Sequence, residues 1–173
     1  MGALLNGKPV VCGGTTTGFN DGSGAKNGCQ NLFNCQWSPV SQLRESRYQG
    51  GAATVKIQGT EYVWITGGRN FRANDLKTTE WIGAGQERGM SIVGPDLPKA
   101  MNSQCMVSYN NTVLIIGGNT PERTNSVLVY KFRDLNDFRY FVYKNPGRYG
   151  TPPDLGWTYF NPNYSAFHIS ALA

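Results

Sequence analysis

Residues 8–14, KPVVCGG, end an apolar run in two adjacent glycines, and the same arrangement returns at residues 61–68, EYVWITGG, and 112–118, TVLIIGG. The first glycines of the three doublets, Gly13, Gly67 and Gly117, are 54 and 50 residues apart. A spacing kept this closely indicates an internal repeat, and repeats of this length are typical of solenoids and propellers. The doublets therefore divide the chain into units of about fifty residues.

Each unit contains four short runs that are typical of β-strands. One run precedes the apolar stretch (residues 3–7, 50–59 and 102–111), and two follow the doublet after a polar loop (residues 27–33, 76–82 and 125–132, then 35–40, 89–94 and 138–143). Gly, Asn, Asp and Pro separate these runs, as turns require. Four strands per unit predict an all-β chain of four-stranded antiparallel propeller blades. The predicted blades are residues 3–43, with a shortened first strand, 44–98 and 99–147, followed by a tail, 148–173.

These units resemble kelch repeats, in which an apolar strand ends in Gly-Gly, a Tyr follows in the third strand and a Trp in the fourth. Tyr130 fits the tyrosine position and Trp37 the tryptophan position, while Trp81 stands where a Tyr is expected. The links PVSQLRESR, residues 39–47, and GPDLPKAM, residues 94–101, are similar to the kelch links between blades, with Lys99 in place of an Arg. The resemblance covers about residues 3–145 and implies a kelch-type β-propeller segment.

Glycine doublets suit the ends of strands that crowd neighbouring blades, because glycine reaches positive φ and has no Cβ to clash. We therefore predict a structural role for all three doublets, although ordinary loop glycines of a β-sandwich are the alternative. The residues concerned are Gly13, Gly14, Gly67, Gly68, Gly117 and Gly118.

Composition agrees with a globular β-rich chain, at 39% hydrophobic residues and 22 glycines in 173 residues. No run approaches the ~18 apolar residues of a membrane span, so none is expected. The net charge of +5 comes from scattered Lys and Arg. Without a basic run, the sequence does not predict nucleic acid as a partner.

Three blades do not close a propeller ring, since a blade buries its faces only against its neighbours. The run SAFHISALA, residues 165–173, is similar to the first strands of the repeats and is expected to start a further blade. The region after Met1 lacks the features of a signal peptide. We therefore expect further blades as partners, from the same or another chain, in either a longer polypeptide or an assembly.

The cysteines bear on the compartment. No pair among Cys12, Cys29, Cys35 and Cys105 has the spacing of a zinc site. In the blade model Cys12 and Cys29 lie on neighbouring strands, and secreted animal kelch proteins resemble this arrangement, so a Cys12–Cys29 disulfide is predicted with Cys29–Cys35 as the alternative. Asn110 and Asn163 head Asn-x-Ser/Thr sequons. These features favour an extracellular or secretory-lumen location over a cytoplasmic one.

Catalysis has little support in the sequence. His168 is the only histidine and lies in an alternating, strand-like run. The copper-radical galactose oxidases share the kelch-type propeller, but they need two histidine ligands, so an oxidase reading requires ligands outside this chain. Asp134 and Asp137 suit a hairpin turn better than a glycosidase pair. We predict no catalytic residue, cofactor or metal; an intracellular kelch adaptor is a further alternative.

The aromatic residues divide into packing and binding candidates. Trp37, Trp64 and Trp81 lie in strands and are expected to pack between blades. The loops after the doublets, residues 15–28, 69–75 and 119–125, should emerge on one face of the ring and mix aromatic with arginine side chains, as interface hot spots do. Arginine binds carboxylate, sulfate and phosphate groups. The sequence therefore predicts a non-catalytic module that binds a protein or anionic glycan through Phe19, Arg69, Phe71, Arg72 and Arg123.

Overall fold

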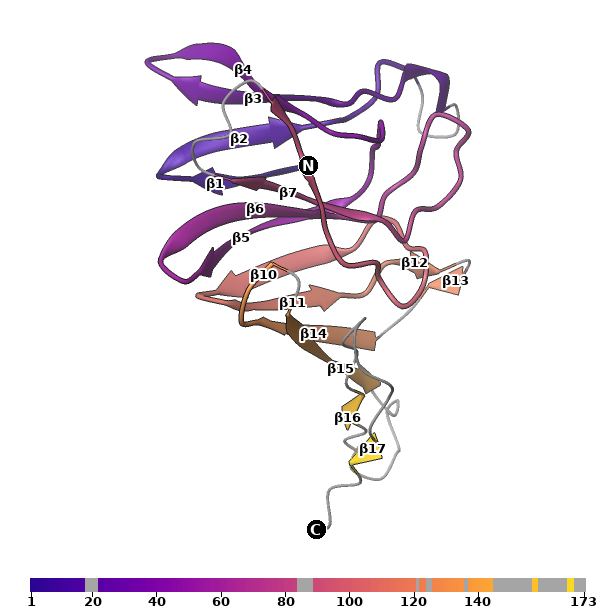
Figure 1. The fold of residues 1–173 in the computed structure, drawn as a ribbon. Coiled ribbons are helices and arrows are strands. Elements are labelled where there is room, and N and C mark those ends of the chain that lie inside the picture. Colours follow the sequence, from indigo (N-terminus) through magenta and orange to yellow (C-terminus); the bar gives the residue numbers. More distant parts are fainter. Residues whose placement is uncertain are drawn as a thin grey trace.

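The computed structural model describes residues 1–17, 22–83, 89–120, 122–123, 126–135, 137–144, 157–158 and 168–169. Their main strands form three sheets, each built on four antiparallel strands and here called blades one, two and three, that stack face to face without closing into a ring (Figure 1). The predicted fold class, an all-β propeller segment of four-stranded blades that this chain does not close, is therefore confirmed.

The strands follow the predicted order, four to each blade. Blade one contains β1 (Gly2–Leu5), β2 (Lys8–Cys12), β3 (Gly28–Phe33) and β4 (Gln36–Gln42). Blade two contains β5 (Gly51–Ile57), β6 (Thr60–Thr66), β7 (Thr79–Gly83) and β9 (Ile92–Val93). Blade three contains β10 (Cys105–Tyr109), β11 (Thr112–Ile116), β14 (Ser126–Phe132) and β15 (Phe138–Lys144).

Shorter elements complete the described chain. The 3-10 helix η1 (Gly22–Gly24) lies between β2 and β3, and the two-strand ribbon β12 (Asn119–Thr120) and β13 (Glu122–Arg123) follows β11. Beyond β15, β16 (Trp157–Thr158) and β17 (His168–Ile169) extend blade three at its outer edge. The rest of the run 165–173 lies outside the described residues, so the further blade expected there stays a prediction.

The run 89–94 differs from its expected place as one strand of blade two. Gly89 and Met90 form β8 (Gly89–Met90), which pairs in parallel with β4 of blade one, and only β9 stays in blade two. Ser91 lies between them and is fully buried; its N–H donates to Gln42 O at 2.9 Å. This segment therefore joins the first two blades at their outer edges.

The glycine doublets place each link between blades onto the blade before it. All six doublet glycines have positive φ, from 54° to 111°. A Cβ on Gly13 would collide with the carbonyl oxygen of Arg47, and a Cβ on Gly67 with that of Met101. In the first two doublets the second glycine donates to the same carbonyl, over 2.9 Å to Arg47 O and 2.8 Å to Met101 O. The doublets thus allow the backbone of the following link to approach closely.

Two apolar clusters hold the blades together. Blades one and two meet through Val10, Cys12, Cys29, Val40, Leu43, Val63, Ile65 and Ile82. Blades two and three meet around Trp64 and Trp81, which are fully buried and stack with ring centroids 5.3 Å apart. Tyr130, also fully buried, meets the Trp64 ring edge-on at 4.9 Å. Trp64 and Trp81 thus pack between blades as predicted, and Tyr130 packs with them.

The prediction that Trp37 packs between blades is wrong. Its side chain is 50% exposed. Trp37 pairs with Leu32 in the β3–β4 register and lies on the face of blade one that points away from blade two. No described residue forms a blade on that side, so the indole ring of Trp37 has no neighbouring blade to pack against.

A buried ion pair joins the first link to blade two. The Arg47 side chain is fully buried, and its Nη2 donates to Glu80 Oε1 at 2.6 Å, while Nη1 donates to Gly67 O and Thr78 O at 2.9 Å. Glu80 Oε2 also accepts from Arg44 N at 2.7 Å and from the Ser91 hydroxyl. Several donors thus compensate the buried carboxylate.

Candidate binding face

The loops that follow the doublets emerge at one side of the stacked sheets, opposite the tight hairpin turns (Figure 1). The loops of blades one and two also contact each other. A Cβ on Gly22, in η1 of blade one, would collide with the backbone of Phe71 in the loop of blade two. These two loops therefore form one continuous surface.

Asn70 shapes the loop between β6 and β7. Its side-chain Oδ1 accepts from Arg72 N at 3.0 Å and from Asn74 N at 3.1 Å, and its backbone bonds to Asn74 O and Ala73 N. An asparagine side chain that accepts from backbone two residues on imitates a turn. The turn presents Phe71, 53% exposed, together with the exposed Arg72.

Arg69 is anchored by backbone and side chain alike. Its backbone pairs with Tyr48 through two hydrogen bonds, of 2.7 and 3.0 Å. Its Nε donates to Asp75 Oδ1 at 2.9 Å, and the same oxygen accepts from Asn102 Nδ2 at 2.8 Å. The hydrogen bond to Asp75 raises the pKa of Arg69, so the guanidinium keeps its charge. The side chain stays 30% exposed, which leaves part of this fixed cation open to solvent.

Arg72 lies over the ring of Phe71, with its Cζ 5.1 Å from the ring centroid. A guanidinium over an aromatic face is attracted by the ring quadrupole. Because the pair is exposed, a ligand can approach both the ring and the cation. Two arginines and one aromatic ring thus lie within four consecutive residues of one loop.

The structure brings together three of the five predicted binding residues: Arg69, Phe71 and Arg72. Phe19 lies outside the described residues, and Arg123 is described only by its backbone, in β13. The sequence reasoning missed Asn70, Asp75 and Asn102, which hold the arginine loop in place. The repeat could have pointed to Asn102. Arg69 and Asn119 each follow a doublet directly, and Arg69 forms a bridge with Tyr48 as Asn119 does with Asn102.

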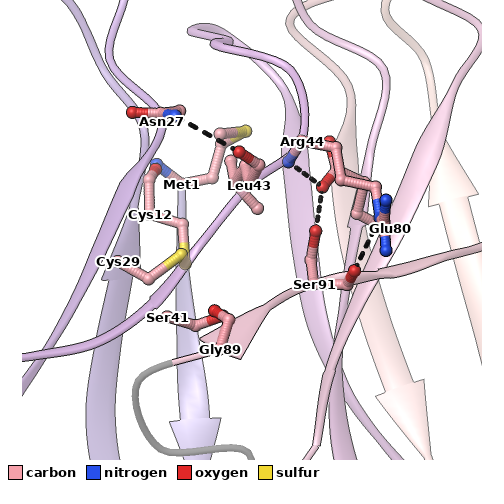
Figure 2. The surroundings of a disulfide bond; sticks show 10 residues. All are labelled: Met1, Cys12, Asn27, Cys29, Ser41, Leu43, Arg44, Glu80, Gly89 and Ser91. Carbon is pink, nitrogen blue, oxygen red and sulfur yellow. Dashed lines mark hydrogen bonds between the residues drawn. A yellow bond between two sulfur atoms is a disulfide. The ribbon is translucent and has the colours of Figure 1, made fainter.

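The structure joins Cys12 and Cys29 in a disulfide, the pair that the sequence predicts (Figure 2). The two residues lie directly opposite each other on β2 and β3 and are buried. Cys35 and Cys105 are free and exposed. Asn110 is exposed in the turn between β10 and β11, whereas Asn163 lies outside the described residues.

Acidic residues considered for catalysis have structural contacts. Asp134 Oδ1 accepts from Asp137 N at 2.7 Å, and Asp137 forms an ion pair with Arg133, as expected of a hairpin turn. The side chain of His168 lies outside what is described. Within the described residues, no group of three His, Cys, Asp or Glu side chains could hold a metal ion.

Among the described residues there is also no helix long and apolar enough to cross a membrane.

Sequence comparison finds no relative: no family model matches the chain, and no curated protein does. Comparison with solved structures finds similar folds, with 133 matching chains. One of them, titled "Structure of YjhT", has a TM-score of 0.64 and 15% sequence identity over 91% of this chain and 54% of that chain. At this identity the likeness shows the fold alone. The chain spans about half the length of that solved protein.

Proposed function

We propose that this chain is a kelch-type propeller segment that binds an anionic ligand, a protein or an acidic glycan, on its doublet-loop face. The observation that carries the proposal is the anchored Arg69 beside the exposed pair of Phe71 and Arg72. Arginine presents a planar fork of donors that suits carboxylate, sulfate and phosphate groups. Aromatic and arginine side chains are also the residues that interface hot spots favour.

Preorganisation supports a binding role for this loop. Asp75, held by Asn102, orients Arg69 before any ligand arrives, and Asn70 fixes the turn that carries Phe71. A side chain that is already ordered loses less entropy when it binds. The loop is therefore built to present its cations and not merely to connect two strands.

The kelch assignment is part of this proposal. It is supported by three doublets that repeat the same φ signs and, in blades one and two, the same hydrogen bonds to the following link. An extracellular or secretory-lumen location is proposed as well, because disulfides persist in oxidising compartments and this chain bridges Cys12 to Cys29. Glycosylation of Asn110 and Asn163 belongs to the same proposal.

The experiment measures binding of the purified chain to two immobilised probes, a glutamate-rich peptide and a sulfated glycosaminoglycan. Arg72→Glu is the main variant, because its side chain is exposed and lies over the exposed ring of Phe71. We expect at least tenfold weaker binding to one probe, with the difference shrinking at high salt. Arg69→Gln, which keeps a hydrogen-bond donor toward Asp75, should act in the same direction.

Lys56→Glu is the matched control, since it makes the same charge change at an exposed position in β5, away from the doublet loops. If Arg72→Glu and Lys56→Glu weaken binding equally, the attraction comes from net charge and the site is not on this face. Unchanged binding of Arg72→Glu at both salt levels, with an intact circular dichroism spectrum, would remove the site altogether.

A further inference from the structure

The two end blades each expose an apolar sheet face. On blade three, Val107, Tyr109 and Ile116 are 53%, 78% and 40% exposed. On blade one, Leu4 and Val11 are 54% and 44% exposed and lie on the same face as Trp37. Contiguous exposed apolar surface of this kind marks an interaction site. We call these the outer face of blade three and the outer face of blade one.

The two outer faces correspond to the two sides of the interfaces already inside the chain. Leu114 and Trp64 both lie three residues before the first glycine of their doublets, and Trp64 packs against blade three. Val11 and Ile115 both lie two residues before the first glycine of their doublets, and Ile115 packs against blade two. The outer face of blade three is thus the side that meets a following blade, and the outer face of blade one is the side that meets a preceding blade.

We propose that the outer face of blade three binds the outer face of blade one in a second copy of this chain. The second copy then offers the same two faces, so two equivalent contacts close the assembly. A heterologous contact that closes in this way gives a ring, whereas one that does not close gives filaments.

The internal interface also predicts which residues meet. Thr66 and Ile116 are each the last residue before a doublet. Gly51 pairs with Thr66 and Cys105 pairs with Ile116, so Gly51 and Cys105 occupy equivalent positions. Gly2 pairs with Val11 and Met106 with Ile115, which makes Gly2 equivalent to Met106. A Cβ on Gly51 would lie 2.7 Å from Met106 Cγ. Cys105 should therefore lie next to Gly2 of the second copy.

The first test is the mass of the purified chain by sedimentation and light scattering. We expect twice the 19.0 kDa of one chain. Tyr109→Glu, which places a charge on the outer face of blade three, should raise the dissociation constant at least tenfold. Val93→Glu is the control, because Val93 is 62% exposed on the outer strand of blade two and belongs to neither outer face. A folded monomer of the unaltered chain overturns the proposal, and so does an open series of larger species.

The second test locates the contact by cross-linking. Gly2→Cys in a Cys35→Ser background leaves the new thiol and the exposed Cys105 as the free cysteines. Mild oxidation should convert most of the chain to a disulfide-linked dimer, and adding Cys105→Ser should abolish it. A covalent dimer that survives Cys105→Ser shows random contact and contradicts the register. Failure to cross-link in a sample with the mass of two chains contradicts it as well.

Discussion

The buried pair of Arg47 and Glu80 gives the sharpest test of how the blades are joined. Arg47→Met removes the cation but leaves the Glu80 carboxylate 3% exposed. It also removes the donors to Gly67 O and Thr78 O. Removing one partner of a buried ion pair costs about 3–5 kcal/mol, because the remaining charge stays buried and uncompensated. We expect a loss of that size in the free energy of unfolding.

At the junction between blades two and three, apolar residues occupy the positions that Arg47 and Glu80 hold between blades one and two. Met101 accepts the doublet hydrogen bond as Arg47 does, and Leu128 occupies the position of Glu80 in its strand. Both residues belong to the apolar cluster between blades two and three. Arg47→Met combined with Glu80→Leu should therefore recover much of the stability that the single change removes.

The recovery should be incomplete, for a reason that the structure gives. Glu80→Leu leaves Arg44 N, Glu45 N and the buried Ser91 hydroxyl without their acceptor, at about 1–3 kcal/mol for each unsatisfied buried group. At the second junction the residue equivalent to Arg44 is Pro98, which has no N–H to satisfy. Adding Arg44→Pro removes one orphan donor but also the 2.8 Å hydrogen bond from Arg44 Nε to Ser91 O, so the triple variant should gain little over the double.

The assay is urea unfolding followed by tryptophan fluorescence and circular dichroism, with unchanged m-values as the check that the transition stays comparable. Lys77→Met is the control. It breaks the exposed ion pair with Asp96, where Lys77 is 61% exposed, and should cost less than about 1 kcal/mol. The reasoning is refuted if Arg47→Met costs no more than this control, or if the double variant is no more stable than Arg47→Met alone.

Three further predictions concern the doublets, the disulfide and a buried phenol. Gly13→Ala should destabilise the fold far more than Gly7→Ala in urea unfolding, because both have positive φ but only Gly13 would collide with Arg47 O; equal losses would contradict the close-approach role. Replacing Cys12 and Cys29 by Ser should cost about 3 kcal/mol, the value for a loop of 17 residues, and reducing agent should then have no further effect. Burial raises the pKa of Tyr130. Its folded state therefore keeps the proton that the unfolded state loses above pH about 10, so stability should fall with rising pH there. Tyr130→Phe should remove about 1.4 kcal/mol per pH unit of that fall; identical pH profiles would count against it.

Much of the fold follows from local sequence pattern. Apolar runs, turn residues and doublets at a repeated spacing place the strands and their order, because strand formation and chain reversal depend on neighbouring residues. The packing of Trp64 and Trp81 follows from the same pattern. Trp37 shows the limit, since a strand tryptophan is buried only where another blade lies against it.

The candidate site was predictable only in part. The sequence pointed to Arg69, Phe71 and Arg72 because they lie in one irregular loop after a doublet. It did not reveal that Asp75 and Asn102 hold Arg69, since Asn102 lies 27 residues from Asp75 along the chain. No local pattern couples positions that far apart.

The sequence by itself determined the repeat, the strands and the doublets, since each depends on spacing along the chain. It favoured the Cys12–Cys29 pair but left Cys29–Cys35 open. Tertiary structure alone decided that β8 joins blade one, that Arg47 meets Glu80, and which sheet faces stay exposed. These outcomes depend on which segments lie side by side after the blades stack. Contacts between distant segments are selected by packing and by the pairing of buried polar groups, which the order of residues does not show.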